Sequence, residues 1–371
     1  MPSDWATKSR ASRFRKPGEA RGPAWVPPAD CTVRVRHTRP DGFEIEGWPV
    51  KIDAGRRQPV GLVTHAHTDH AARHEHIICT PETALLLGAR WKRLTTRAVP
   101  YGQSFTLDGA RVTLLPAGHI LGSAMALVEF AGRRLLFTGD LRTTSSTLSE
   151  VATPVACDVL VIESTFGRRE YRFPDRERIH RLITGFVDAA RASSYTPVLT
   201  GYSLGKAQEL VAHLAAYHET VWVHPKVAEY CALYQQAGVV LPEVQVPLAG
   251  APPGALVVMT PDFQRSEWRE RIVRPRVCFC SGWALGGPGG HYAADQMIPL
   301  SDHADCASLV EFAKATGAAR VYTMHGFAAE LADLLCREGM DALPLPKQWQ
   351  DVSASEGVQH TAETLDLFGT S

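Results

Sequence analysis

Short apolar runs recur along the chain, separated by polar turns and amphipathic stretches. The runs at 60–63, 134–137 and 158–162 are short and largely apolar, which is typical of buried strands. Residues 111–115 begin with polar and apolar side chains in alternation, as a half-buried strand does. The pattern predicts a protein built on several strands that end in polar loops.

From about residue 176 the apolar period switches repeatedly between that of a helix and that of a strand. We expect helices near 176–192, 206–218 and 226–237, and strands at 196–200, 221–224, 255–259 and 277–283. Strands that alternate with helices form parallel pairs, because a parallel return needs a crossover that a helix supplies. This part of the chain therefore predicts an α/β sheet rich in parallel strands.

A loop of six residues with three histidines follows the run at 60–63. Its sequence is His-Ala-His-Thr-Asp-His, residues 65–70. A tight loop at a strand end lets side chains two positions apart converge, whereas a helix would splay them. Imidazole nitrogen and carboxylate oxygen are ligands that zinc and similar transition metals take. The loop predicts a metal site rather than a histidine-rich surface turn, because further candidate ligands follow in order.

Two later strand ends supply those candidates. His119 lies between glycines in the loop that follows the strand at 111–115, and Asp140 ends a Thr-Gly-Asp turn after the strand at 134–137. Taken alone, His119 would more often be a hydrogen-bonded loop histidine and Asp140 a turn residue. In series after the histidine loop, both are predicted ligands.

These motifs, in this order, resemble those of the metallo-β-lactamase family. The resemblance implies an α/β protein with an αββα sandwich and two bound metal ions. Carried over by position, it assigns the first metal to His65, His67, His119 and Asp140, and the second to Asp69, His70 and the bridging Asp140. Asp53 matches an aspartate that orients the ligands, although a turn-forming aspartate before Gly55 would look the same.

Three further segments resemble the β-CASP nucleases, in which a second domain interrupts the metallo-β-lactamase fold. Glu163 follows the strand at 158–162, His303 lies in a Ser-Asp-His-Ala-Asp segment, and His325 follows a later apolar run. They match the three additional β-CASP motifs, and His325 completes the second metal site in part of the family. The resemblance implies an inserted α/β β-CASP domain at 165–297 and metallo-β-lactamase halves at 31–164 and 298–371. The first thirty residues depart from the resemblance, and their polar, basic composition predicts a disordered basic tail at 1–30.

The similarity is narrowest to the bacterial ligase-associated DNA exonucleases. It implies hydrolysis of phosphodiester bonds in DNA, a role in DNA repair, and an ATP-dependent DNA ligase and a helicase as partners. His325 points elsewhere, because the RNA-processing members of the family share this histidine while the eukaryotic DNA-repair members carry valine. An RNA-processing ribonuclease is therefore the alternative function.

The predicted chemistry is metal-dependent hydrolysis. Two divalent ions, zinc or manganese, would polarise the scissile phosphate and activate water, with Asp140 bridging them. His303, oriented by Glu163, is the candidate general acid for the leaving oxygen, although a structural histidine in a capping segment would fit its position as well. The metal motifs alone suit lactam, thioester or glyoxalase hydrolases too. The late motifs favour a nuclease, and the full ligand set argues against an inactive scaffold.

The distribution of charged residues suggests which side chains could bind the substrate. The 371 residues carry a formal net charge of zero, so only a local groove would be positive. Arg168 and Arg169 open an arginine-rich segment that suits contact with a phosphate backbone, although a solvated helix face would show the same charges. The segment also contains aromatic residues that could stack on bases, namely Phe166, Tyr171 and Phe173.

A second phosphate site is expected where the helix at 206–218 begins. Ser203 and Lys206 lie there beside glycines. A helix N-terminus of this composition binds phosphate well, because its backbone N–H groups and dipole face the anion. We therefore add Ser203 and Lys206 to the predicted substrate-binding residues.

The remaining composition bears on location. The eight cysteines form no Cys-x-x-Cys pair, which favours reduced thiols in a cytoplasm. No apolar run approaches the roughly 18 residues of a membrane span, so no membrane partner is expected. The first thirty residues are polar and lack the apolar core of a signal peptide, and their basic residues are Lys8, Arg10, Arg13, Arg15, Lys16 and Arg21. A cytoplasmic location is expected.

Overall fold

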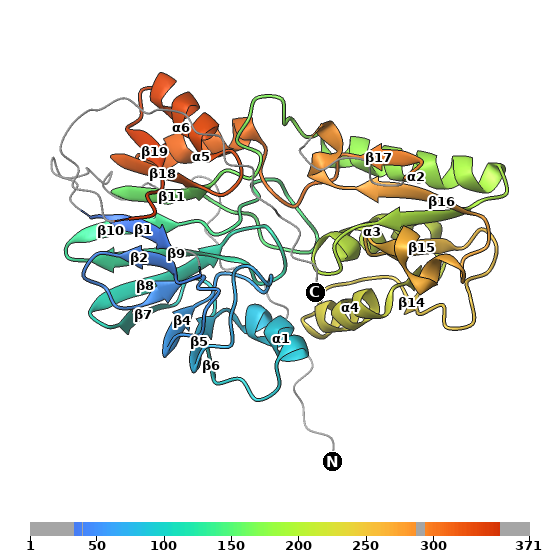
Figure 1. The fold of residues 1–371 in the computed structure, drawn as a ribbon, viewed down its shortest axis with the longest axis horizontal. Coiled ribbons are helices and arrows are strands. Elements are labelled where there is room, and N and C mark those ends of the chain that lie inside the picture. Colours follow the sequence, from blue (N-terminus) through green and yellow to red (C-terminus); the bar gives the residue numbers. More distant parts are fainter. Residues whose placement is uncertain (1–32, 39, 287–293, 349–371) are drawn as a thin grey trace, which may run out of the picture.

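The computed structural model describes residues 33–38, 40–286 and 294–348. The predicted tail at 1–30 lies outside these ranges. The described strands form three sheets, and the first two pack face to face (Figure 1).

The first sheet has the strand order β1-β2-β3-β4-β5-β6. Its strands are β1 (Val35–Thr38), β2 (Gly42–Ile45), β3 (Lys51–Ile52), β4 (Val60–Leu62), β5 (His76–Cys79) and β6 (Thr96–Ala98). The pairs from β3 to β6 are parallel, so the carboxyl ends of β3 and β4 lie at the same edge.

The second sheet has the order β19-β18-β11-β10-β9-β8-β7 and mixes parallel with antiparallel pairs. Its strands are β7 (Ser104–Leu107), β8 (Ala110–Pro116), β9 (Ala124–Phe130), β10 (Arg133–Phe137), β11 (Val159–Glu163), β18 (Arg320–Met324) and β19 (Ala342–Pro344). The strands predicted at 111–115, 134–137 and 158–162 are confirmed as β8, β10 and β11.

The two sheets enclose one apolar core and carry helices on their outer faces. Leu62 of the first sheet and Phe137 of the second belong to the cluster between them. Helix α1 (Pro81–Arg90) packs on the outer face of the first sheet, and helices α5 (Cys306–Thr316) and α6 (Ala328–Arg337) pack on that of the second. The predicted αββα sandwich is confirmed.

The third sheet lies beside the sandwich, and all its pairs are parallel. In the order β14-β13-β15-β12-β16-β17 it comprises β12 (Thr196–Thr200), β13 (Val221–Val223), β14 (Val244–Gln245), β15 (Leu256–Met259), β16 (Pro275–Cys280) and β17 (Gln296–Ile298). The parallel α/β pattern expected from residue 176 onwards is confirmed.

Three helices cover this sheet: α2 (Arg176–Ala192), α3 (Lys206–Leu214) and α4 (Pro225–Gln236). Four short 3-10 turns complete the described helices: η1 (Ala215–Tyr217), η2 (Phe263–Arg265), η3 (Glu267–Arg269) and η4 (Gly282–Leu285). The helix expected at 206–218 is therefore shorter and continues as η1. The strand expected at 277–283 ends at Cys280, because the Ser281 hydroxyl caps η4 by accepting from the Trp283 amide.

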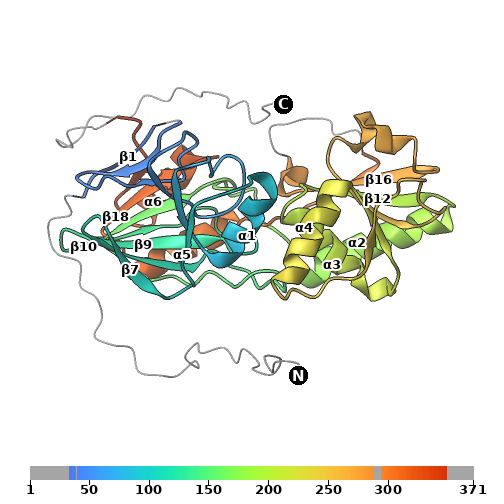
Figure 2. The ribbon, with the colours of Figure 1, turned by 90° about the horizontal axis from the view of Figure 1, so that it is seen from below.

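Sandwich and third sheet meet across one continuous apolar cluster. It joins Leu86 and Leu87 of α1 to Tyr230 and Tyr234 of α4, and both views show these two helices side by side (Figures 1 and 2). The domain boundaries at 164/165 and 297/298 stay a prediction. Within the described residues, no helix is long and apolar enough to cross a membrane.

Strand ends of the sandwich gather at one edge because close backbone contacts hold their loops together. Gly118, next to His119, has a φ of 80°, and a β-carbon there would lie 2.1 Å from the carbonyl oxygen of Arg142. Only glycine permits both the left-handed backbone and this approach. The loops after β8 and β10 are thereby fixed against each other.

Gly118→Ala should destabilise the fold more than Gly109→Ala. Both glycines have a φ of 80°, but a β-carbon at Gly109 meets nothing within 4 Å. Each change costs about 1–2 kcal/mol for the left-handed backbone, and the clash at Gly118 adds about 1–3 kcal/mol. Urea unfolding of both variants measures the difference in the free energy of unfolding. Equal losses of stability would contradict the close approach of Gly118 to the Arg142 carbonyl.

Candidate metal centre

The predicted ligands converge where the strands of the sandwich end. His65 and His70 follow β4, His119 follows β8 and Asp140 follows β10. All four are buried. Their side chains reach one site although they lie up to 75 residues apart in the chain, from 65 to 140.

Four donor atoms form a compact set. His67 Nδ1 lies 3.2 Å from His65 Nε2 and 3.1 Å from His119 Nε2. Asp140 Oδ2 lies 3.4 Å from His65 Nε2 and 3.5 Å from His119 Nε2. Ligands on a tetrahedral zinc ion are separated by about 3.3–3.4 Å, given bonds of about 2.0–2.1 Å. The spacing and the donor types therefore fit one transition-metal ion.

The other ring nitrogen of each of these histidines meets an oxygen. The contacts are His65 Nδ1 to Thr64 Oγ1 at 3.1 Å, His67 Nε2 to the Leu204 carbonyl at 3.3 Å, and His119 Nδ1 to the Asp302 carbonyl at 2.9 Å. A backbone carbonyl can only accept, so it selects the tautomer with a proton on the nitrogen that faces it. The opposite nitrogen keeps its lone pair for a metal.

A second group of predicted ligands surrounds His70. Its Nδ1 lies 2.8 Å from Asp53 Oδ2, and its Nε2 lies 3.5 Å from Asp140 Oδ1 and 3.6 Å from Asp69 Oδ2. Asp53 also accepts hydrogen bonds from the amide and hydroxyl of Thr64 at 2.8 and 2.6 Å. Asp53 thus contacts both Thr64, which directly precedes the ligand loop, and His70, which ends it.

The second group is looser than the first. Asp69 is exposed, and the His325 ring centroid lies 5.5 Å from that of His70. Among the described residues, the sets of donor atoms that all lie within 4.8 Å of one another include neither Asp69 nor His325. Both residues, with His70 and Asp53, line a cavity of about 190 Å³. The structure brings them to the same place without closing a full ligand set.

Burial and neighbouring charges divide the histidines by protonation. Burial lowers the pKa of His65 and His119 well below the usual value, and nearby histidines lower it further. Burial would also lower the pKa of His70, but Asp140 and Asp53 raise it to about 10. Burial raises the pKa of Asp140 to about 7. A cation bound at these side chains would therefore compete with protons on His70 and Asp140.

Glu163 and His303 form a pair beside this cluster. His303 Nδ1 lies 2.9 and 3.1 Å from the two carboxylate oxygens of Glu163, which is fully buried. The amide of Leu141 donates to Glu163 Oε1 at 2.5 Å. Burial opposes charge on both side chains, but their mutual attraction lowers the pKa of Glu163 and raises that of His303 to about 9. The His303 ring centroid lies 4.4 Å from that of His119.

The predicted substrate-binding residues differ in their exposure and in the side chains they contact. Arg168 pairs with Glu330 and lies over the ring of Phe327 at 4.0 Å. Arg169 is exposed and Ser203 is partly exposed. The predicted phosphate role of Lys206 is wrong for this conformation, because its ammonium is buried and lies 2.5 Å from Asp302 Oδ1.

Base stacking on the first two aromatics of the arginine-rich segment is likewise excluded. Phe166 and Tyr171 are only 3% and 2% exposed and contact each other and Trp283. Sequence reasoning also missed Thr64, Leu204 and Asp302. Thr64 and Asp302 each adjoin a predicted residue, which was an available signal. The Leu204 carbonyl carries none, since a backbone group is the same at every position.

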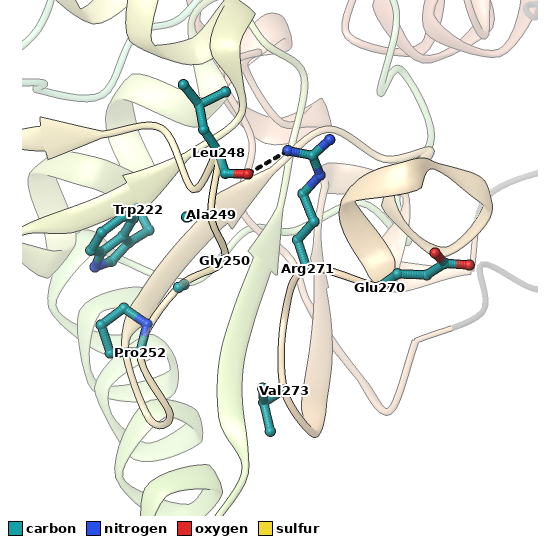
Figure 3. Close-up of a pocket in the computed structure, with 9 residues that line it drawn as sticks. Trp222, Leu248, Ala249, Gly250, Pro252, Glu270, Arg271 and Val273 are labelled. Atoms are coloured by element: carbon teal, nitrogen blue, oxygen red, sulfur yellow. Dashed lines mark hydrogen bonds between the residues drawn. The ribbon is translucent and has the colours of Figure 1, made fainter.

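A larger hollow lies away from the metal centre, on the third sheet (Figure 3). Its volume is about 610 Å³, and Trp222, Leu248 and Val273 are among its lining residues. Arg271 closes one side by donating to the Leu248 carbonyl at 2.6 Å. None of the predicted site residues lines this hollow, so the larger of the two cavities is not the predicted metal site.

Comparison with known proteins identifies the family. No family model matches the chain. Over 302 residues it is 37% identical to a protein named probable DNA ligase from Opitutus terrae, covering 80% of this chain. Over 297 residues it is 29% identical to the 5′ exonuclease Apollo of Gallus gallus, covering 74%. Matches of this length span both the sandwich and the third sheet. The chain belongs to the β-CASP branch of the metallo-β-lactamase family.

Other comparisons are shorter or more distant. An endoribonuclease, YSH1 of Yarrowia lipolytica, is 33% identical over 153 residues, or 41% of this chain. The chain spans 29% of the ligase-named protein, 61% of Apollo and 18% of YSH1. A crystal structure of an Enterococcus faecalis protein of unknown function has a similar fold, with a TM-score of 0.53 and 14% identity over 77% of this chain and 79% of that one.

His65→Ala should lower the zinc content, because the tetrahedral donor set loses one corner. We expect less zinc bound per protein chain at saturation than in the wild-type protein. The matched control is His76→Ala, since His76 is exposed on β5. Elemental analysis after dialysis measures both variants. Zinc content in His65→Ala equal to that of His76→Ala would contradict the assignment.

Proposed function

We propose that this β-CASP protein is a metal-dependent DNA exonuclease that acts in DNA repair with an ATP-dependent DNA ligase and a helicase. The nuclease assignment rests on one observation: the Glu163–His303 pair lies beside a cluster of donors spaced for a metal ion. Small-molecule hydrolysis would need the metal site but not this pair. The assignment to DNA and repair is supported by the long match to a protein named for DNA ligation.

The ligands hold two divalent ions, zinc or manganese, in this proposal. His65, His67, His119 and Asp140 bind the first, and Asp69, His70, Asp140 and His325 bind the second. When bound, the ions supply positive charge against the scissile phosphate and activate water. Asp140 contributes one oxygen to each side, because its Oδ2 faces His65 and His119 while its Oδ1 faces His70.

His303 donates the proton to the leaving oxygen. Its Nδ1 is committed to Glu163, which leaves Nε2 for the substrate. Glu163 accepts from the Leu141 amide and from His303 at the same oxygen, so the imidazole is held in one orientation. General acid catalysis of this kind needs a donor already aligned with the leaving group.

The substrate strand runs between the sandwich and the proposed insert at 165–297. Arg169 and Ser203 are the candidates for phosphate contact, since both retain exposure. Arg168 is a third candidate, because its side chain stays 43% exposed while its guanidinium pairs with Glu330. Phosphate contacts of this type position a strand without reading its sequence.

Ribonuclease activity is the second candidate. The observation that favours it is the match to endoribonuclease YSH1, together with His325 beside the second ligand group. A shared metal-hydrolysis site would serve either nucleic acid, because the reacting phosphodiester is the same.

End-labelled DNA should be degraded from an end, and RNA of matched sequence should be degraded more slowly by at least about tenfold, a difference of about 1.4 kcal/mol in transition-state stabilisation. Single-turnover cleavage with added zinc or manganese measures both rates. Protein with Asp140→Ala, purified identically, controls for contaminating nucleases. Equal or faster cleavage of RNA would move the protein to the ribonuclease branch.

The two late histidines should fail in different ways. His303→Ala should keep its metals and lose about 10²–10⁴ in turnover, because a proton donor is removed. His325→Ala should weaken metal affinity by about 10–100-fold as well as slow the reaction. Glu163→Gln should resemble His303→Ala. Metal analysis beside single-turnover cleavage separates them, and the roles are exchanged if His303→Ala loses metal while His325→Ala retains it.

A further inference from the structure

The start of helix α3 in the third-sheet region touches the metal centre at several points. The Leu204 carbonyl accepts the Nε2–H of His67 at 3.3 Å. Gly205 has a φ of 88°, and a β-carbon there would lie 2.4 Å from Cγ2 of Ile120, the residue after His119. Only glycine lets the helix come this close to the His119 loop.

The next residue along the helix makes a buried ion pair with the sandwich. Lys206 Nζ lies 2.5 Å from Asp302 Oδ1, and the two side chains are only 4% and 6% exposed. Asp302 also accepts the Nδ1–H of His119 on its backbone carbonyl at 2.9 Å, and it directly precedes His303. A single residue thus joins the helix, a metal ligand and the proton donor.

A second ion pair fixes the same helix one turn later. Glu209 accepts two hydrogen bonds from Arg142, at 3.0 and 2.8 Å, and both residues are buried. Lys206 and Glu209 are three positions apart and so share one face of α3. The helix is therefore held against the loop of Asp140 as well as that of His303.

We propose that Lys206 is a positioning residue of the metal centre, which through Asp302 sets the acceptor of His119 and couples docking of α3 to metal affinity. Without the ammonium, the ion pair that ties Asp302 to α3 is lost, so the Asp302 backbone moves and the His119 imidazole is no longer held with Nε2 toward the metal. The helix start also supplies the Leu204 acceptor of His67. Two of the first metal's ligands thus depend on the docking of one helix. The proposal rests on the proposed metal site but not on the substrate.

Titration with cobalt(II), a spectroscopic substitute for zinc, tests the proposal. Lys206→Met should bind cobalt about 10–100-fold more weakly, as for lost partners of metal-bound histidines, with an altered visible absorption spectrum. Lys206→Arg should restore both. The double variant Lys206→Met/Asp302→Asn leaves no unpaired buried carboxylate, and it carries the test if Lys206→Met does not fold.

The control is Arg191→Met, which removes an ion pair with Glu219 elsewhere in the third-sheet region. It should keep wild-type affinity and spectrum. Wild-type cobalt binding in folded Lys206→Met or in the double variant would overturn the proposal, as would equal weakening in Arg191→Met. Failure of the proposed function reads differently: wild-type protein would bind cobalt with this dependence on Lys206 and cleave no nucleic acid.

Discussion

A buried imidazole that offers the lone pair of one nitrogen to a metal carries a proton on its other nitrogen, and the centre is organised by the need to give that N–H an acceptor. The acceptors come from distant parts of the chain, as a hydroxyl, two backbone carbonyls and a carboxylate: Thr64, Leu204, Asp302 and Asp53. Each acceptor orients one ring and selects its tautomer. Burying an unpaired polar group costs free energy, so loss of any of these acceptors would destabilise the buried ring that it contacts.

The same requirement explains why the third-sheet region matters to chemistry performed on the sandwich. Parallel strand ends supply most of the ligands, but the acceptors of His67 and His119 lie at the start of α3 or on a residue that α3 holds. The two regions also share a continuous apolar cluster around α1 and α4. Apolar packing around α1 and α4 therefore holds the two regions together. The hydrogen bonds to Leu204 and Asp302 then orient the imidazoles of His67 and His119.

Much of the fold was predictable because apolar periodicity reports burial directly. The strands β8, β10, β11 and β12 were placed closely, as was helix α2, and the ligand order in the chain predicted which side chains converge. Lys206 was misassigned because a lysine at a helix N-terminus looks the same in sequence whether it meets a phosphate or a buried carboxylate. Phe166 and Tyr171 were misjudged for the same reason, since aromatic side chains suit both a core and a stacking surface. The Leu204 carbonyl has no signature at all.

The oxygen acceptors determine which nitrogen of each histidine is available to a metal ion. Anomalous diffraction at the zinc edge from crystals of the zinc-loaded protein tests it most directly. We predict an ion bonded to Nε2 of His65, Nδ1 of His67, Nε2 of His119 and Asp140, at about 2.0–2.2 Å, with the opposite ring nitrogens still on their oxygen acceptors. An ion bound elsewhere, or through Nε2 of His67 with the Leu204 contact broken, would contradict the account.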